Sequence, residues 1–169
     1  LEKGNLRIYY RSDGDLEKFS ALEVHVILPN GKIEKVNSDN IFTEEVNKYV
    51  SAKKIFIPNF QKGCIIEYRY EIQSANVHSL YKTWFFQKDI PVRWSQLTVT
   101  IPQYFNYVYL MQANRKFDLE ENKQGLASSG DGYQYQASTT TFGLANLPAV
   151  KDEPFITTLE DYRAQIGFQ

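Results

Sequence analysis

The amino-acid sequence predicts an all-β protein, an antiparallel β-sandwich with a short helical or irregular segment at its C-terminus. Apolar and polar residues alternate with a period of two in several segments, which is typical of strands with one buried face. Turn-forming residues separate these segments, and no helical pattern stands between them as it would in a β-α-β protein. Aromatic residues make up 15% of the chain, with 12 Tyr and 11 Phe, and large rings favour strands.

A hairpin is the clearest prediction in the first part of the chain. A strand is expected over 22–28, where alternate residues are apolar: Leu22, Val24, Val26 and Leu28. The pair Asn30-Gly31 follows, and it predicts a tight turn because both residues tolerate a positive φ. Residues 33–36 then form the returning strand.

The next segments lead to a long amphipathic strand. Residues 38–54 fit either a helical turn or a frayed strand, and both alternatives stay open. Residues 55–57 form a short apolar strand that Pro58 ends, because proline cannot donate to a ladder. Over 64–72 the two faces differ sharply, with one apolar and one charged. The apolar face carries Ile66, Tyr68, Tyr70 and Ile72, and the charged face carries Glu67, Arg69 and Glu71.

Further strands are expected over 79–87, 97–101 and 105–111, and another begins at Tyr133. The strand over 105–111 has apolar residues on both faces, which favours a central position covered on both sides. Four large side chains are expected to build the core: Tyr68, Tyr70, Trp84 and Phe86.

The last part of the sequence is expected to be irregular. Residues 144–155 contain two prolines and are predicted to be extended. Thr157 and Glu160 have the spacing of a capping box, which predicts a short helix near Leu159 that Gly167 stops.

Size and composition predict one domain over residues 1–169, with a core large enough to need no disulfide. The 19 Lys and Arg balance 20 Asp and Glu and are scattered. This distribution argues against nucleic acid as a partner. No apolar run reaches the length of a membrane span. The single cysteine, Cys64, excludes an internal disulfide.

Residues with catalytic or metal-binding chemistry are few, and the sequence predicts no catalytic residue, no metal site and no cofactor. Cys64, His25 and His78 lack the close spacing of metal ligands. His25 and His78 are better interpreted as surface residues. Cys64 lies between Gly63 and Ile65 at the start of a strand, which favours a small buried residue over an activated thiolate.

Glu67 and Glu71 share one face of a strand, about 7 Å apart by strand rise. That spacing fits a pair of carboxylates for glycoside hydrolysis only loosely. Arg69 lies between them, so a ladder of charges across neighbouring strands is favoured. A self-contained hydrolase that uses Glu67 and Glu71 remains a third hypothesis, and it requires a concave pocket around them.

The tyrosines of the second half suggest a binding surface. An exposed aromatic patch that binds glycan or peptide is the alternative to a plain β core with tyrosine at its rim. The candidate residues are Tyr104, Tyr107, Tyr109, Tyr133 and Tyr135.

Several motifs, in this order along the chain, resemble one family. They are Phe56-Ile57-Pro58-Asn59, Gly63 to Tyr70, Trp84 to Val92, Val99-Thr100-Ile101-Pro102 and Asn146 to Phe155. From about Leu22 onward the chain resembles the domain of unknown function that precedes the transglutaminase-like core in secreted bacterial proteins.

The resemblance implies a fragment of a longer protein with a transglutaminase-like domain downstream. The family's Cys-His-Asp triad belongs to that following domain, so no catalytic residue is carried over to this chain. The implied role is a non-catalytic accessory module that positions the substrate or partner. The implied location is periplasmic or extracellular, with a cell-envelope peptide or glycan as a further partner. The alternative is a stand-alone glycan- or peptide-binding β-sandwich module.

Overall fold

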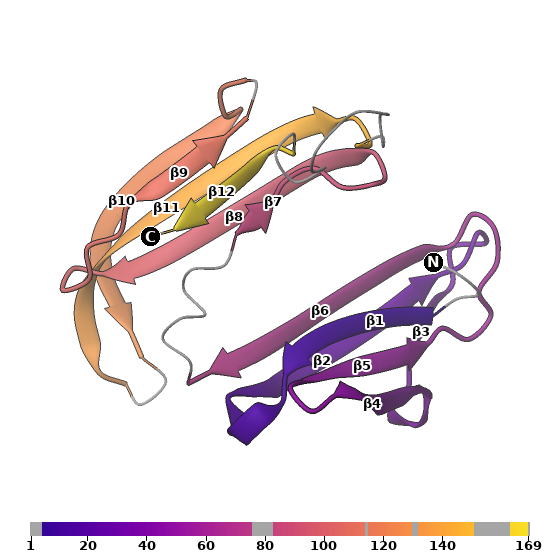
Figure 1. The fold of residues 1–169 in the computed structure, drawn as a ribbon. Helices are drawn as coiled ribbons and strands as arrows, with labels where there is room; N and C mark the ends of the chain where they lie inside the picture. The colour runs from indigo at the N-terminus through magenta and orange to yellow at the C-terminus, as the bar shows by residue number, and fades with distance from the viewer. Residues whose placement is uncertain (1–4, 76–82, 114, 130–131, 151–162, 169) are drawn as a thin grey trace. The chain divides into compact units, whose positions relative to one another are not determined.

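The computed structural model describes residues 5–75, 83–113, 115–129, 132–150 and 163–168, and these form twelve strands in four antiparallel sheets (Figure 1). No helix in this part of the chain has seven residues; two 3₁₀ turns occur, η2 at Asp13–Asp15 and η3 at Ser38–Asn40. The predicted all-β, antiparallel fold is therefore confirmed. The strands are β1 (Asn5–Arg11), β2 (Glu17–Ile27), β3 (Ile33–Lys35), β4 (Ile41–Asn47), β5 (Val50–Phe56), β6 (Ile65–Ser74), β7 (Trp84–Phe85), β8 (Val92–Pro102), β9 (Tyr109–Gln112), β10 (Leu119–Ser128), β11 (Gln134–Leu147) and β12 (Gln165–Phe168).

The chain divides into two compact units, one over Leu1–Ser79 and one over Leu80–Gln169. The first unit contains the sheets β1-β5-β4 and β3-β2-β6. Both sheets supply the core between them, which consists of Ile8, Val24, Val26, Val36, Ile55 and Ile57. That residues 1–169 act as one domain with a transglutaminase-like domain downstream stays a prediction.

The predicted hairpin is present between β2 and β3. Gly31 N donates to the Leu28 carbonyl oxygen over 2.8 Å, and Leu28 N donates to the Lys32 carbonyl oxygen over 2.9 Å. Of the pair Asn30-Gly31, only Gly31 has a positive φ, at 82°. Asn30 instead accepts a hydrogen bond from Lys32 N with its side chain. The turn therefore depends on Gly31 for its left-handed backbone.

The undecided segment 38–54 forms η3 and two paired strands, β4 and most of β5. The Asn47 side chain accepts hydrogen bonds from the backbone N–H groups of Tyr49 and Val50, which closes the turn between these strands. An asparagine that binds the backbone two and three residues later stabilises such a turn.

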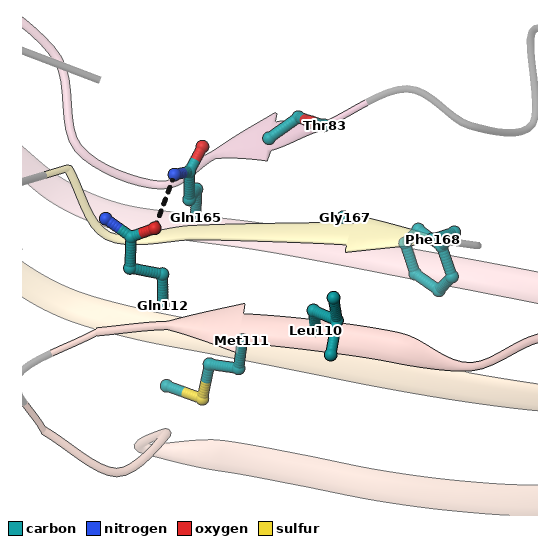
Figure 2. Close-up of a pocket in the computed structure, with 7 residues that line it drawn as sticks. All are labelled: Thr83, Leu110, Met111, Gln112, Gln165, Gly167 and Phe168. Atoms are coloured by element: carbon teal, nitrogen blue, oxygen red, sulfur yellow. Dashed lines mark hydrogen bonds between the residues drawn. The ribbon is translucent and has the colours of Figure 1, made fainter. Parts of the chain in front are cut away.

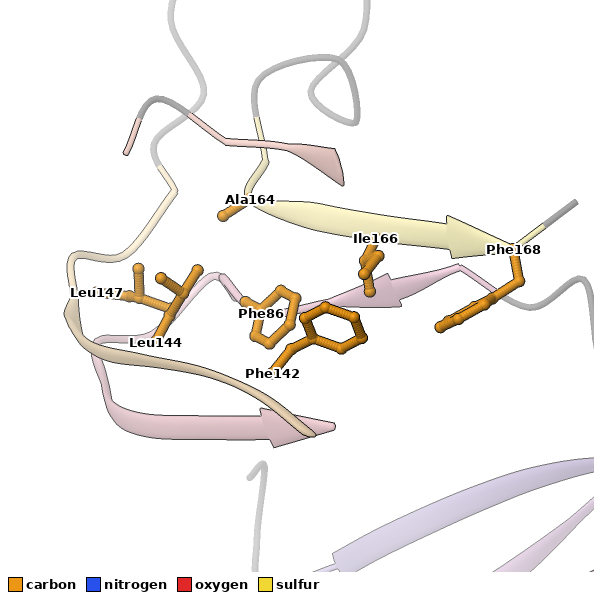
Figure 3. Close-up of a cluster of buried hydrophobic side chains, with 7 residues drawn as sticks. All are labelled: Phe86, Phe142, Leu144, Leu147, Ala164, Ile166 and Phe168. Atoms are coloured by element: carbon orange, nitrogen blue, oxygen red, sulfur yellow. The ribbon is translucent and has the colours of Figure 1, made fainter. Parts of the chain in front are cut away.

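The second unit contains the sheets β10-β11-β8 and β7-β12-β9. Side chains from β11 and β12 meet between the two sheets, and Figure 3 shows Phe142 of β11 and Ile166 of β12 in one cluster with Phe86. The buried members are Phe86, Phe142, Leu144, Leu147, Ala164, Ile166 and Phe168. This unit is thus a small sandwich with its own core.

The strand expected over 105–111 is shorter and differently placed. Only Tyr109–Gln112 is a strand, β9, and β9 lies at the end of the sheet β7-β12-β9 with Leu110 56% exposed. The prediction of a central strand was wrong because apolar residues on both faces do not show how many neighbours a strand has.

The predicted core is correct for Phe86, which is buried, but wrong for three other rings. Tyr68 and Tyr70 are 44% and 45% exposed, because β6 is the last strand of its sheet, and Trp84 is 38% exposed. The helix predicted near Leu159 lies outside the described residues. Gly167 lies in strand β12, where Ile166 and Phe168 are buried at alternate positions.

Candidate functional site

Cys64 and His25 do not form a catalytic pair. Cys64 packs against the core of the first unit, and its thiol is free and half-buried. His25 is on the other face of β2 from the buried Val24 and Val26, and its Nε2 lies 3.7 Å from Glu23 Oε1. A nucleophilic thiolate needs a base within hydrogen-bonding reach. The two side chains lie on opposite faces of one sheet, so this arrangement is absent.

The carboxylates Glu67 and Glu71 lie on the charged face of β6 and are exposed. The strand pairing places Glu67 opposite His25 and Arg69 opposite Glu23. Glu23 also pairs with Lys35 over 2.9 Å, and the hydrogen bond from Lys35 lowers the pKa of Glu23. This is the expected ladder of charges across strands.

Metal ligands do not gather within the described residues, where no three His, Cys, Asp or Glu side chains lie together. Among these residues no helix is long and apolar enough to cross a membrane.

The candidate tyrosines lie in the second unit, and three of them belong to one run of ring contacts. Tyr135 and Tyr104 have ring centroids 6.5 Å apart, Tyr104 and Phe105 4.8 Å, and Phe105 and Tyr107 5.9 Å. Tyr109 packs edge-on against Phe142 at 5.0 Å. Tyr109 therefore belongs to a separate group of rings beside the core. Tyr104, in the first group, is 69% exposed.

Tyr133 is 67% exposed and precedes β11. Like Tyr104 and Tyr135, it is not among the residues that line the cavity beside Tyr107 and Tyr109.

That cavity, which we call the tyrosine cleft, has a volume of about 300 Å³. It lies between one face of the sheet β10-β11-β8 and the segment that leads from β8 to β9. Its lining consists of Val99, Ile101, Pro102, Gln103, Phe105, Asn106, Tyr107, Val108, Tyr109, Asn122, Ser138, Thr140, Phe142 and Phe168. Two backbone hydrogen bonds hold the segment in place, from Gln103 N to the Gln136 carbonyl and from Phe105 N to the Pro102 carbonyl, both 3.0 Å.

The sheet forms a polar wall of the cleft. The inner face of β11 begins as core with Leu144 and Phe142 and continues as Thr140 and Ser138, which are partly exposed. Asn122 of β10 donates from Nδ2 to Ser138 Oγ over 2.9 Å and to Thr140 Oγ1 over 2.7 Å. Along this face of the sheet, a row of amide and hydroxyl groups therefore lies between the apolar core and the surface.

A phenol–carboxylate contact lies beside the cleft. Tyr109 OH donates to Glu120 Oε1 over 3.3 Å. Loss of solvation raises the pKa of Tyr109, and the charge of Glu120 raises it further. Both effects keep the phenol neutral and able to donate.

The sequence identified Tyr107 and Tyr109 of the cleft but not its polar wall. The signal was available in the alternation of Ser138 and Thr140 with the same period as Phe142 and Leu144. The position of Asn122 beside them depends on the pairing of β10 with β11, which the sequence does not show.

A second pocket, about 670 Å³, lies over the sheet β7-β12-β9 (Figure 2). Gln165 Nε2 donates to Gln112 Oε1 over 2.9 Å across two of its strands. The exposed Leu110 and the small Gly167 leave this surface open and mostly apolar. Its described lining residues carry no titratable side chain; they are Thr83, Leu110, Met111, Gln112, Gln165, Gly167 and Phe168.

Comparisons with known proteins found one family and one similar structure. The family DUF3857, described as a domain of unknown function with a solved structure, matches residues 1–150. A crystal structure from Parabacteroides distasonis, described as a putative protease, has a similar fold, with a TM-score of 0.70 and 14% sequence identity. The match covers 98% of this chain and 32% of that one, so this chain spans about a third of that protein's length. No curated protein matches the chain.

Proposed function

The chain belongs to the DUF3857 family of domains of unknown function, and from that premise we propose that it is a non-catalytic module of a longer, protease-like protein. The observation that carries the proposal is the structural match, in which nearly the whole of this chain corresponds to about a third of a larger protein. The catalysis would then belong to another part of the parent protein, a transglutaminase-like domain with a Cys-His-Asp triad.

The chemistry of the described residues supports this proposal. The half-buried Cys64 faces the core while His25 lies on the opposite face of the sheet. In the proposed role the module positions the substrate or the partner domain. The resemblance to secreted bacterial proteins extends the proposal to a periplasmic or extracellular location.

An amidase and acyl-transfer assay on this chain tests the proposal. We expect no release of a chromogenic amine from a glutamine anilide and no transfer to an added amine, for the native chain and for Cys64→Ala alike. Turnover that disappears in Cys64→Ala would show that the chain is itself an enzyme. Turnover by both proteins at equal rates would indicate a contaminant. Chromatographic fractionation tests this, because the activity of a contaminant would not elute together with the chain.

A second candidate function is that of a stand-alone glycan- or peptide-binding module. The tyrosine cleft favours it, because aromatic rings and fixed polar groups face one cavity there. Ligand sites combine an apolar lining with a few placed polar groups in this way.

A further inference from the structure

We propose that the tyrosine cleft binds a neutral saccharide, with the hydroxyl groups of Ser138 and Thr140 as the donors that orient it. This inference rests on the second candidate function above and names its ligand class. It follows from the charge of the cleft, from the direction in which its hydroxyl groups donate, and from the strand pairing behind them.

The first argument is the absence of charge. Every described residue that lines the cleft carries an uncharged side chain. An ionic group that entered would lose hydration without gaining an ionic partner among these lining residues, which is costly. The carboxylate of Glu120 beside the cleft already accepts a hydrogen bond from Tyr109 OH. The ligand that fits is therefore neutral.

The second argument is the pattern of hydrogen bonds on the polar wall. Both amide hydrogens of Asn122 are used, one toward Ser138 Oγ and one toward Thr140 Oγ1. A hydroxyl that accepts in this way keeps its own hydrogen to donate. Gln124 Nε2 in turn donates to Asn122 Oδ1 over 3.3 Å, which keeps the amide in this orientation. Ser138 and Thr140 are thus prepared to donate to ligand oxygen atoms.

The third argument is the aromatic wall that accompanies these donors. The rings of Phe105, Tyr107 and Tyr109 supply apolar and weakly polar surface in the same cavity. A pyranose ring has hydroxyl and ring oxygens around its rim and C–H groups on its faces. The oxygens of such a sugar can therefore accept hydrogen bonds from Ser138 and Thr140 while its C–H face packs against an aromatic ring. These contacts compensate for most of the hydration that the sugar loses on binding.

The fourth argument separates a saccharide from a peptide. One common way for an extended peptide to bind is to add to a free strand edge through main-chain hydrogen bonds. Ser138 and Thr140 lie on β11, which is central and pairs with β10 on one side and β8 on the other. The sheet uses the backbone hydrogen-bonding groups of β11, so a peptide cannot add to this wall as a further strand. This wall offers only its side chains. The volume of about 300 Å³ is at the lower limit for ligand sites and suits one or two sugar rings.

Calorimetric titration of the chain tests the inference, with cellotetraose and chitotetraose as neutral saccharide probes and end-blocked tetraalanine as the peptide probe. We expect a saccharide to bind and the peptide not to bind. Thr140→Val removes one donor at nearly constant shape and should weaken binding about fivefold to tenfold. Thr141→Val is the matched control, because Thr141 is the next residue of the same strand and its hydroxyl bonds to Thr98 Oγ1 at 3.1 Å on the opposite face. This variant should leave the affinity for the saccharide within twofold of the native value.

A third variant, Tyr107→Ala, tests the aromatic wall and should also weaken binding. Tryptophan fluorescence melting checks that each variant is folded. Saccharide binding that Thr140→Val and Thr141→Val affect equally would overturn the inference, as would binding that neither Thr140→Val nor Tyr107→Ala weakens. Peptide binding that depends on Thr140 and Tyr107 would refute the inference of a saccharide ligand but would support the second candidate function, a binding module. If none of the three probes binds at millimolar concentration, both the inference and the second candidate function fail.

Discussion

Separate cores in the two units predict that each unit can be destabilised by itself. Ile166 belongs to the core of the second unit and Ile55 to that of the first, and both side chains are fully buried. The two tryptophans of the chain, Trp84 and Trp94, both lie in the second unit. Tryptophan fluorescence therefore reports on the second unit alone, whereas far-ultraviolet circular dichroism reports on both.

The substitutions Ile166→Val and Ile55→Val each remove one buried methylene. Loss of that group costs about 0.8 kcal/mol of transfer free energy, and the cavity brings the total to roughly 0.5–1.5 kcal/mol. For a unit of this size a loss of about 1 kcal/mol lowers the melting temperature by about 4–8 °C. Ile166→Val should shift the fluorescence transition by this amount. Ile55→Val should leave the fluorescence transition in place and shift only part of the dichroism signal.

The comparison has two outcomes that would refute the reasoning. If both variants shift the fluorescence transition equally, the chain unfolds as one cooperative domain, as its length suggested. If Ile166→Val shifts nothing, Ile166 does not pack in the core as described.

Two further predictions concern contacts in the second unit. A Cβ atom at Gly143 would lie 2.6 Å from Trp94 Cζ2, so Gly143→Ala should displace the indole ring, change its emission maximum and cost about 1–3 kcal/mol of stability. Gly125→Ala is the control, because a Cβ atom there meets nothing within 4 Å. An unchanged emission maximum in Gly143→Ala would contradict the close contact. Lost solvation, and then the charge of Glu120, raise the pKa of Tyr109 in the folded chain. The neutral phenol therefore contributes fully to stability below the ordinary tyrosine pKa of about 10, and this contribution is lost as the pH rises through the pKa of Tyr109 in the folded chain. Spectrophotometric titration of Glu120→Gln should show this pKa shifted back toward the ordinary value, and an unchanged titration curve would exclude Glu120 as a cause.

The strand pattern of the sequence was largely sufficient for the fold class. The alternation in 22–28 and the Gly31 turn predicted β2 and its hairpin, because period and turn chemistry are local properties. The placement of β9 at a sheet end was not predictable in this way. The number of neighbours of a strand depends on residues far along the chain, here Gln165–Phe168.

The candidate site was predictable on one side only. Tyrosines are conspicuous in a sequence, and Tyr107 and Tyr109 were named from it. Asn122 is an ordinary polar residue until the pairing with β11 brings it to Thr140, eighteen positions later in the chain. The site therefore depends on a register that no single segment encodes.

Strand β9 also affects how the isolated chain behaves in concentrated solution. Among the described residues it pairs with β12 on one side only, and Val108 and Leu110 are 65% and 56% exposed beside its other edge. The unpaired N–H and C=O groups of an exposed edge are a template on which a strand from another copy can add. The net charge of the chain is only −1, so electrostatic repulsion between copies is weak. The edge of β9 is therefore one of the sheet ends at which copies of this chain can associate.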